Sequence, residues 1–136
     1  MPDYKRNDQS NAWIARANQD LLSIKNNLVA EDIPWNSVVY QSHQAAEKYL
    51  KAFLIAQGEL PEHIHSLNSL LLKCHGFDNS LEDLRQDCRF LDRYGITARY
   101  PDRSPEMNEE LGRMSFEAAA RICSRIQAAL TSQEAS

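Results

Sequence analysis

Two lysines near the middle of the chain, Lys48 and Lys51, are the first candidates for chemistry. Residues three apart lie on one face of a helix, and a lysine pair on one face can hold phosphate oxygens as point charges. The other interpretation is a solvated helix face on which Glu47 neutralises part of the charge, because charged pairs on exposed faces are common. Spacing alone does not choose between the two.

A second candidate for phosphate chemistry is the Arg-Tyr-Pro-Asp sequence that begins at Arg99. Because Pro101 restricts the residue before it to extended conformations, the Tyr100 ring and the Arg99 guanidinium have fixed directions. A fixed arginine beside an aromatic ring suits phosphate binding with base stacking. In the alternative interpretation, Tyr100 closes the end of a helix bundle, and Arg99 caps helix carbonyls or pairs with Asp20 or Glu47.

A zinc site is the third interpretation, because His63, His65, Cys74 and His75 are close in sequence and imidazole and thiolate are the usual zinc ligands. Their spacing matches no standard ligand motif, and Cys74 falls on an apolar helix face. A core thiol with loop histidines is the better interpretation. The chain also lacks a Gly-rich phosphate loop, a Gly-x-Ser-x-Gly elbow and a His-Glu-x-x-His motif. We therefore expect no catalytic residue, no metal and no cofactor.

The composition predicts one all-α domain over residues 1–136. A chain of 136 residues with 43% hydrophobic content can bury most of its apolar surface in a single core. Only 4 Gly and 5 Pro interrupt a sequence rich in Ala, Leu, Gln, Glu and Arg, which favours helices. The core should cover about residues 10–130, with short polar tails at both ends.

Charge and cysteine usage limit the classes of function. A net charge of −4 argues against non-specific binding to nucleic acid over the whole surface, so a phosphate site has to be a local cluster. Three cysteines without a Cys-x-x-Cys motif suit reduced thiols in a cytoplasm. The chain has no signal-peptide run, and no segment approaches the ~18 apolar residues that cross a bilayer. We expect a soluble, cytoplasmic protein.

Hydrophobic periodicity predicts four long helices and one short helix between the second and fourth of the five. The long helices are expected at residues 10–31, 34–57, 80–95 and 108–130. Short turns between them predict an antiparallel up-and-down four-helix bundle with one additional short helix. The polar tail after residue 130 should be frayed.

Helix-end signals fix several of these boundaries. Pro34 is expected as the first residue of its helix, Gly58 in a left-handed conformation after that helix, and Asn108 as the cap of the last helix. His65 or Ser66 should cap the short helix. A weak capping box at residues 80–83 should open the helix that follows.

The helix at residues 34–57 carries two adjoining apolar stripes, so it should be the central helix. Its remaining exposed strip is expected to consist of Gln44, Lys48, Lys51 and Ile55. On the first helix, the face that should see water consists of Arg16, Asp20, Ser23 and Asn27.

Three marks occur in a fixed order: the helical run at residues 44–54, the His-Ser-Leu sequence at 65–67 and the Arg-Tyr-Pro-Asp sequence at 99–102. Together they resemble the HEPN family, the nucleotide-binding helical domain named for higher eukaryotes and prokaryotes, in its bacterial or archaeal stand-alone type. The resemblance covers roughly residues 10–130. It implies a four-helix bundle, a homodimer and a small nucleotidyltransferase partner, in pairs that act as toxin–antitoxin or stress modules.

Many members of the family are metal-independent ribonucleases with an Arg followed four to six residues later by a His. This chain lacks that motif in any register, because only Arg6 and Arg16 precede a histidine and both lie far from His43. A His65 and Arg99 pair could replace it only by meeting in space.

The first hypothesis is therefore a non-catalytic protein that binds an ATP-like nucleotide and works with a nucleotidyltransferase. Its site residues would be the lysines and Arg99 on phosphates, Tyr100 against the base and His65 as a hydrogen-bond partner: Lys48, Lys51, His65, Arg99 and Tyr100. One alternative is a ribonuclease toxin that uses a non-standard Arg and His set on RNA. The other is a helical interaction module that only dimerises or docks a partner helix.

Overall fold

The computed structural model describes residues 8–61, 63–95 and 107–135. These residues form five α-helices and one 3-10 helix, with no strand among them: α1 (Asp8–Leu28), α2 (Trp35–Ala56), α3 (Leu67–His75), η1 (Asn79–Leu84), α4 (Arg85–Gly95) and α5 (Glu109–Ala135). The all-α prediction is confirmed. No helix in the described ranges is both long enough and apolar enough to span a membrane.

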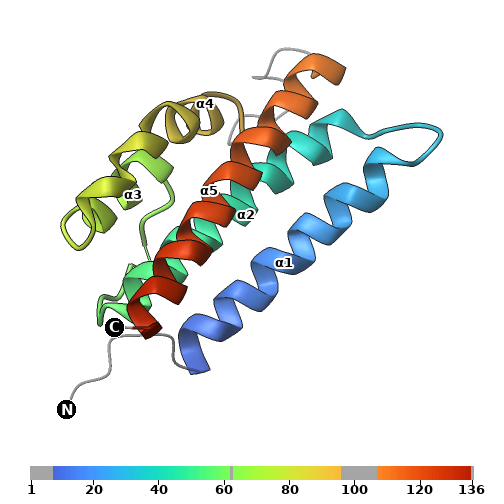
Figure 1. The fold of residues 1–136 in the computed structure, drawn as a ribbon. Helices are drawn as coiled ribbons and strands as arrows, with labels where there is room; N and C mark the ends of the chain where they lie inside the picture. Colours follow the sequence, from blue (N-terminus) through green and yellow to red (C-terminus); the bar gives the residue numbers. More distant parts are fainter. Residues whose placement is uncertain (1–7, 62, 96–106, 136) are drawn as a thin grey trace.

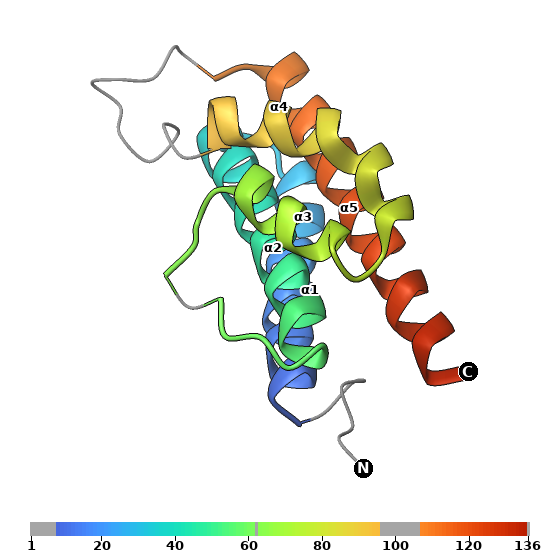
Figure 2. The same ribbon diagram turned by 90° about the vertical axis from the view of Figure 1, so that its left-hand side faces the viewer.

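Helix α2 is the centre of the molecule, as its two apolar stripes predicted. It packs between α1 and α5, and α1 runs antiparallel to it (Figure 1). The segment from α3 to α4 covers another side of α2 and also contacts α5 (Figure 2). Between Ala45 and Ala56, every residue of α2 except Lys48 is buried.

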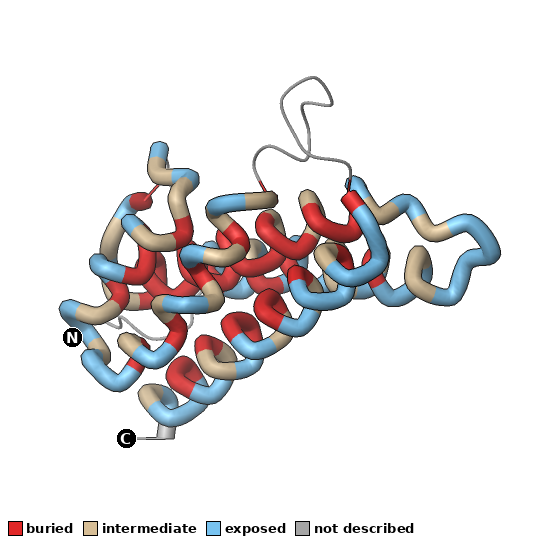
Figure 3. The backbone as a smooth tube through the Cα atoms, turned by 90° about the horizontal axis from the view of Figure 1, so that it is seen from above, coloured by how far each residue is buried: buried red, intermediate tan, exposed pale blue. Residues whose placement is uncertain are grey.

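The hydrophobic core follows α2 along its length. Buried residues lie on the inward faces of the helices and exposed residues on their outer faces (Figure 3). The largest side chains with no measurable exposure come from all five α-helices and η1, and they include Ile24, Phe53, Leu70, Leu81, Leu91 and Ile126. Because apolar burial drives folding, these contacts fix the places of the helices that carry the polar site described below.

Several predicted helix ends are confirmed. Ser66 caps α3 by accepting a hydrogen bond from the Ser69 amide, and Asn108 accepts one from the Leu111 amide at 2.9 Å. Gly58 has φ of +92°, the left-handed conformation expected after α2. Pro34 was predicted as the first residue of α2, but it is the N-cap, and the helix begins one residue later, at Trp35.

The fourth predicted helix begins differently from the prediction. Residues 79–84 form the 3-10 helix η1, and its cap is Asp78, whose side chain accepts from the Ser80 amide. The capping box at residues 80–83 was therefore wrong. At the other end of the chain, α5 continues to Ala135, and Gln133 exchanges hydrogen bonds of 2.6 and 3.2 Å with Gln57. The frayed tail was also wrong for residues 131–135, because α5 stays helical there.

The outward face predicted for α1 was wrong in part. Arg16 is exposed, but Asp20 pairs with Lys48, and Ser23 accepts a hydrogen bond of 2.9 Å from Gln41. Asn27 also lies within 3.5 Å of Gln41. The contact between α1 and α2 is thus wider than the apolar stripe alone, because polar pairs continue it on one side.

Candidate functional site

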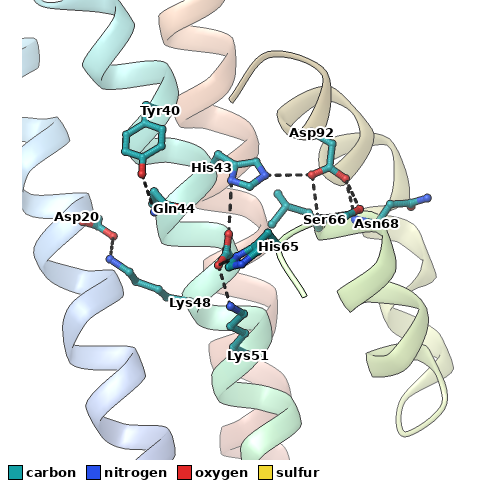
Figure 4. Close-up of polar contacts among 12 residues, drawn as sticks. Asp20, Tyr40, His43, Gln44, Lys48, Lys51, His65, Ser66, Asn68 and Asp92 are labelled. Carbon is teal, nitrogen blue, oxygen red and sulfur yellow. Dashed lines mark hydrogen bonds and ion pairs between the residues drawn. The ribbon is translucent and has the colours of Figure 1, made fainter. Parts of the chain in front are cut away.

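Five ionisable side chains from three parts of the chain form a polar cluster beside α2, which we name the Glu47 cluster. His43, Glu47 and Lys51 come from α2, His65 from the connection before α3, and Asp92 from α4 (Figure 4). The three α2 residues lie four apart, a spacing that places them on one face of the helix. Packing of α3 and α4 against α2 brings the other two to that face.

Glu47 is the centre of the cluster. Its Oε2 accepts a hydrogen bond from the Lys51 ammonium at 2.9 Å and lies 3.2 Å from His65 Nδ1. Its Oε1 lies 3.9 Å from His43 Nδ1. One carboxylate therefore faces a lysine and two imidazoles, each of which carries positive charge when protonated.

Asp92 joins the cluster to the start of α3. Its carboxylate lies 3.0 Å from His43 Nε2 and accepts from the Leu67 amide at 2.9 Å and the Asn68 amide at 3.0 Å. It also accepts from the Ser66 hydroxyl at 3.0 Å. A carboxylate suits this place because helix N-termini carry unpaired amides and a partial positive charge.

These contacts set the ionisation of Asp92. Burial by itself would raise the pKa of this carboxyl, but the hydrogen bond to His43 and those from the α3 amides and the Ser66 hydroxyl together lower the pKa. Asp92 is therefore an ionised cap that α4 supplies to α3.

The cluster is costly to bury. The side chains of His43 and Lys51 are only 2% and 3% exposed, and a charge inside a protein destabilises the fold unless partners compensate it. The Lys51 ammonium also lies 5.5 Å from the centre of the Trp13 ring, within the range of a cation–π contact. Such groupings of buried ionisable residues are frequent at functional sites.

Close packing holds His43 in place. A Cβ atom added to Gly95 would lie 2.3 Å from the His43 Cβ, so only glycine fits at the end of α4 beside this imidazole. The sequence indicated Gly95 as a helix end. The structure adds that its missing side chain allows α4 to approach α2.

A small pocket adjoins the cluster at Lys51. Its volume is about 90 Å³, and its walls are one polar, one charged and four apolar residues: Gln9, Trp13, Lys51, Ile55, Leu60 and Pro61. The pocket is partly open to solvent. Lys51 is thus both a wall of this pocket and a partner of Glu47.

The structure corrects the exposed strip that was predicted on α2. Lys51 and Ile55 are buried, and their neighbours in the pocket, Trp13 and Pro61, come from α1 and from the chain after α2. The Lys48 ammonium is 2.6 Å from Asp20 Oδ2 and 22% of the side chain is exposed. The two lysines therefore have different partners and do not form one solvent-facing pair.

Of the other predicted site residues, the structure brings His65 to the cluster. Its side chain is 68% exposed, so His65 lies at the solvent edge while Glu47, 10% exposed, lies inside. Arg99 and Tyr100 lie outside the described residues. Sequence reasoning did not select His43, although its spacing to Glu47 and Lys51 was a usable signal. It also missed Asp92, for which no local signal exists.

The preferred interpretation of Cys74 is confirmed. Cys74 is buried on the apolar face of α3, its thiol contacts the Leu50 carbonyl, and burial raises the pKa of the thiol. Within the described ranges, no three His, Cys, Asp or Glu side chains are grouped so that they could hold a metal ion.

The chain belongs to the HEPN family, because the family model for the HEPN domain matches residues 10–129. This is a helical family of nucleotide-binding and ribonuclease-type domains. Searches of curated proteins and of solved structures found no match.

Proposed function

We propose that this HEPN protein binds an ATP-like nucleotide at the mouth of the Glu47 cluster, the solvent edge at which His65 lies, and has no catalytic residue set of its own. The observation that carries the proposal is the cluster itself, in which the buried Lys51 and His43 and the exposed His65 surround the Glu47 carboxylate. Its exposed member, His65, can meet a ligand without any rearrangement of the helices.

Residue roles follow from exposure. His65 donates a hydrogen bond to a phosphate oxygen, and Lys48 reaches the same ligand after leaving Asp20. Lys51 contacts a phosphate oxygen through the pocket that it lines. Arg99 and Tyr100 complete the site with a phosphate contact and a base-stacking ring, and Arg99 follows Gly95, which packs on His43, by only four residues in sequence. Replacement of Arg99 by Ala then abolishes nucleotide binding and leaves the melting temperature nearly unchanged. If the variant loses thermal stability together with nucleotide binding, Arg99 has a structural role.

The partner in this proposal is a small nucleotidyltransferase that supplies the metal-binding carboxylates for its own chemistry. The pair works as a toxin–antitoxin or stress module in the cytoplasm. The family's up-and-down four-helix bundle is the frame that holds the ligand, and the protein is a homodimer. Coexpression of the chain with a nucleotidyltransferase encoded beside it, followed by copurification, tests the partnership.

An interaction module is the second candidate, and the outer face of α5 favours it. Ala120 and Ser124 line hollows on both sides of this helix, of about 390 Å³ towards α1 and about 440 Å³ towards α4 and η1. Small residues on such a face permit a second helix to approach closely. In this candidate function, nucleotides do not bind at all.

A ribonuclease activity is a separate outcome. The members of the Glu47 cluster include histidines and a lysine but no arginine. Incubation of the purified protein with RNA at neutral pH in EDTA separates this outcome from binding alone, because intact RNA leaves no role for a metal-independent nuclease.

A thermal-shift titration with ATP, GTP and a short RNA, with and without Mg²⁺, tests the proposal. A ligand that binds only the native state raises the melting temperature by mass action. A saturable rise with a nucleotide supports nucleotide binding. An unchanged melting temperature with every ligand rejects it and leaves the interaction module.

A further inference from the structure

Glu47 occupies a place that is built for an anion. The Lys51 ammonium, His65 and His43 all face its carboxylate, at 2.9, 3.2 and 3.9 Å. Hydrogen bonds in which donor or acceptor is ionised are short and strong, and phosphate oxygens accept them as carboxylates do. The two nearer groups, Lys51 and His65, would suit a phosphoryl group if the Glu47 carboxylate moved away.

The adjoining pocket has the size of a phosphoryl group. Its volume of about 90 Å³ equals the share of roughly three water molecules in the liquid and is below the ~150 Å³ cavity that takes up a benzene ring. A nucleobase is therefore too large for it. Trp13, Leu60 and Pro61 supply apolar walls beside Lys51, and low local polarity strengthens a charge contact.

We propose that the Glu47 cluster is a phosphoryl-binding site that Glu47 keeps closed. A phosphoryl group enters through the small pocket at Lys51, replaces the Glu47 carboxylate on Lys51 and His65, and so opens the site. This inference deepens the proposed function, on which it rests, since it names the phosphoryl part of the nucleotide as the group recognised and Glu47 as the residue that limits binding.

The Glu47 carboxylate should compete with phosphates for Lys51 and His65. The carboxylate is attached to α2 and is always present, so a free anion must displace a partner that loses no translational freedom on pairing. The unmodified protein should therefore bind small phosphates weakly. Removal of the Glu47 charge should leave Lys51 buried without its carboxylate, which destabilises the fold and makes an external anion favourable.

The test uses Glu47→Gln, which keeps the shape of the side chain and removes its charge, and inorganic pyrophosphate as the probe at constant ionic strength. Without pyrophosphate, Glu47→Gln should melt at a lower temperature than the unmodified protein. Pyrophosphate should raise the melting temperature of the variant again. Titration calorimetry should show that the variant binds pyrophosphate about tenfold more tightly than the unmodified protein does. Equal affinity in the two proteins overturns the proposal.

Two further variants locate the effect. Asp87→Asn removes a carboxylate that pairs with Arg121 on α5 and takes no part in the Glu47 cluster, so it should leave pyrophosphate affinity unchanged. Adding Lys51→Met to Glu47→Gln should remove the gain. A gain in Asp87→Asn as large as that in Glu47→Gln, or a gain that survives the loss of Lys51, contradicts a site at Glu47.

A measurement on the unmodified protein covers the case in which Glu47→Gln does not fold. Pyrophosphate up to about 10 mM, beyond the millimolar range of weak affinities, should shift the NMR signals of the His65 ring. His75, the last residue of α3, is the matched control, because it is also a partly exposed histidine near a carboxylate. Its Nε2 lies 4.0 Å from Glu82 of η1. A His65 ring that does not respond, or a His75 ring that responds equally, overturns the proposal.

Failure of this inference is distinguishable from failure of the proposed function. If the unmodified protein binds ATP but Glu47→Gln gains no affinity for pyrophosphate, nucleotide binding stands and the closed site is wrong. If Glu47→Gln gains pyrophosphate affinity while neither protein binds a nucleotide, the anion site stands and the proposed nucleotide function is wrong.

Discussion

At the scale of single residues, Asp92 takes part both in the capping of α3 and in the Glu47 cluster. One carboxylate caps α3 and pairs with His43, so the position of the chain that carries His65 depends on a side chain from α4. Hydrogen bonds to a charged group contribute more to stability than those between neutral groups. Asp92 is thus the residue at which a single substitution should reach both the fold and the cluster.

Asp92→Asn is expected to lower the free energy of unfolding by about 2 kcal/mol at pH 7. Because the folded-state pKa of Asp92 is lowered, its contribution is present above the unfolded pKa of 3.8 and is lost as the pH falls through the folded pKa. The difference between the two proteins in urea unfolding should therefore shrink below about pH 4.

A control on the same helix separates this effect from general loss of charge. Asp87 pairs with Arg121, whose side chain is 59% exposed, and an exposed pair contributes about 0.5 kcal/mol. Asp87→Asn should be nearly neutral. A cost equal to that of Asp92→Asn, or a difference that does not depend on pH, contradicts the role given to Asp92.

Gly95 gives a steric prediction. Gly95→Ala places a methyl group 2.3 Å from the His43 Cβ, and overpacking of this kind costs about 1–3 kcal/mol. Gly76→Ala is the matched control, since its nearest neighbour would be the Lys73 carbonyl at 3.3 Å and its φ of −63° is open to alanine. Chemical unfolding should show a clear loss for Gly95→Ala and a small effect for Gly76→Ala; similar values for both would contradict the close approach.

At the scale of elements, local patterns predicted most of the helices and long-range contacts produced most of the site. Periodicity and caps such as Ser66 and Asn108 act within a few residues, so they can be recognised in the sequence. The His43–Asp92 contact joins residues 49 apart, and nothing near either residue indicates the other. The burial of Lys51 likewise depends on segments that pack over α2 from elsewhere.

The cap of α5 offers a test at this scale. Asn108→Ala should lower the free energy of unfolding by about 1 kcal/mol, because the Leu111 amide loses its acceptor. Asn26→Ala, at an exposed position within α1, should be neutral or slightly stabilising, since alanine favours helix. Thermal unfolding of both variants checks this, and an unchanged Asn108→Ala protein would show that the cap contributes nothing.

At the scale of the whole molecule, one core around α2 encloses both the apolar contacts and the thiols. Cys74, Cys88 and Cys123 are free and buried. Burial, with the nearby Asp92 and Asp87 charges, raises the pKa of Cys88 to about 12, and burial raises the pKa values of the other two thiols as well. The thiolate is the reactive form, so the folded protein should protect all three.

Thiol labelling measures this protection. At pH 8, a thiol-specific reagent should modify the folded protein at least about a hundredfold more slowly than the same protein in denaturant, where the thiols have ordinary pKa values. Fast labelling of any cysteine in the folded state would contradict the burial of that residue.

The measurement that tests the central claim most directly is a calorimetric titration with ATP of the unmodified protein, His65→Ala and His75→Ala. The account predicts saturable binding in the unmodified protein, an affinity about tenfold weaker or lower still in His65→Ala, and no change in His75→Ala, with all three proteins melting at similar temperatures. Absence of ATP binding in the unmodified protein, or equal binding in His65→Ala, would contradict a nucleotide site at the mouth of the Glu47 cluster.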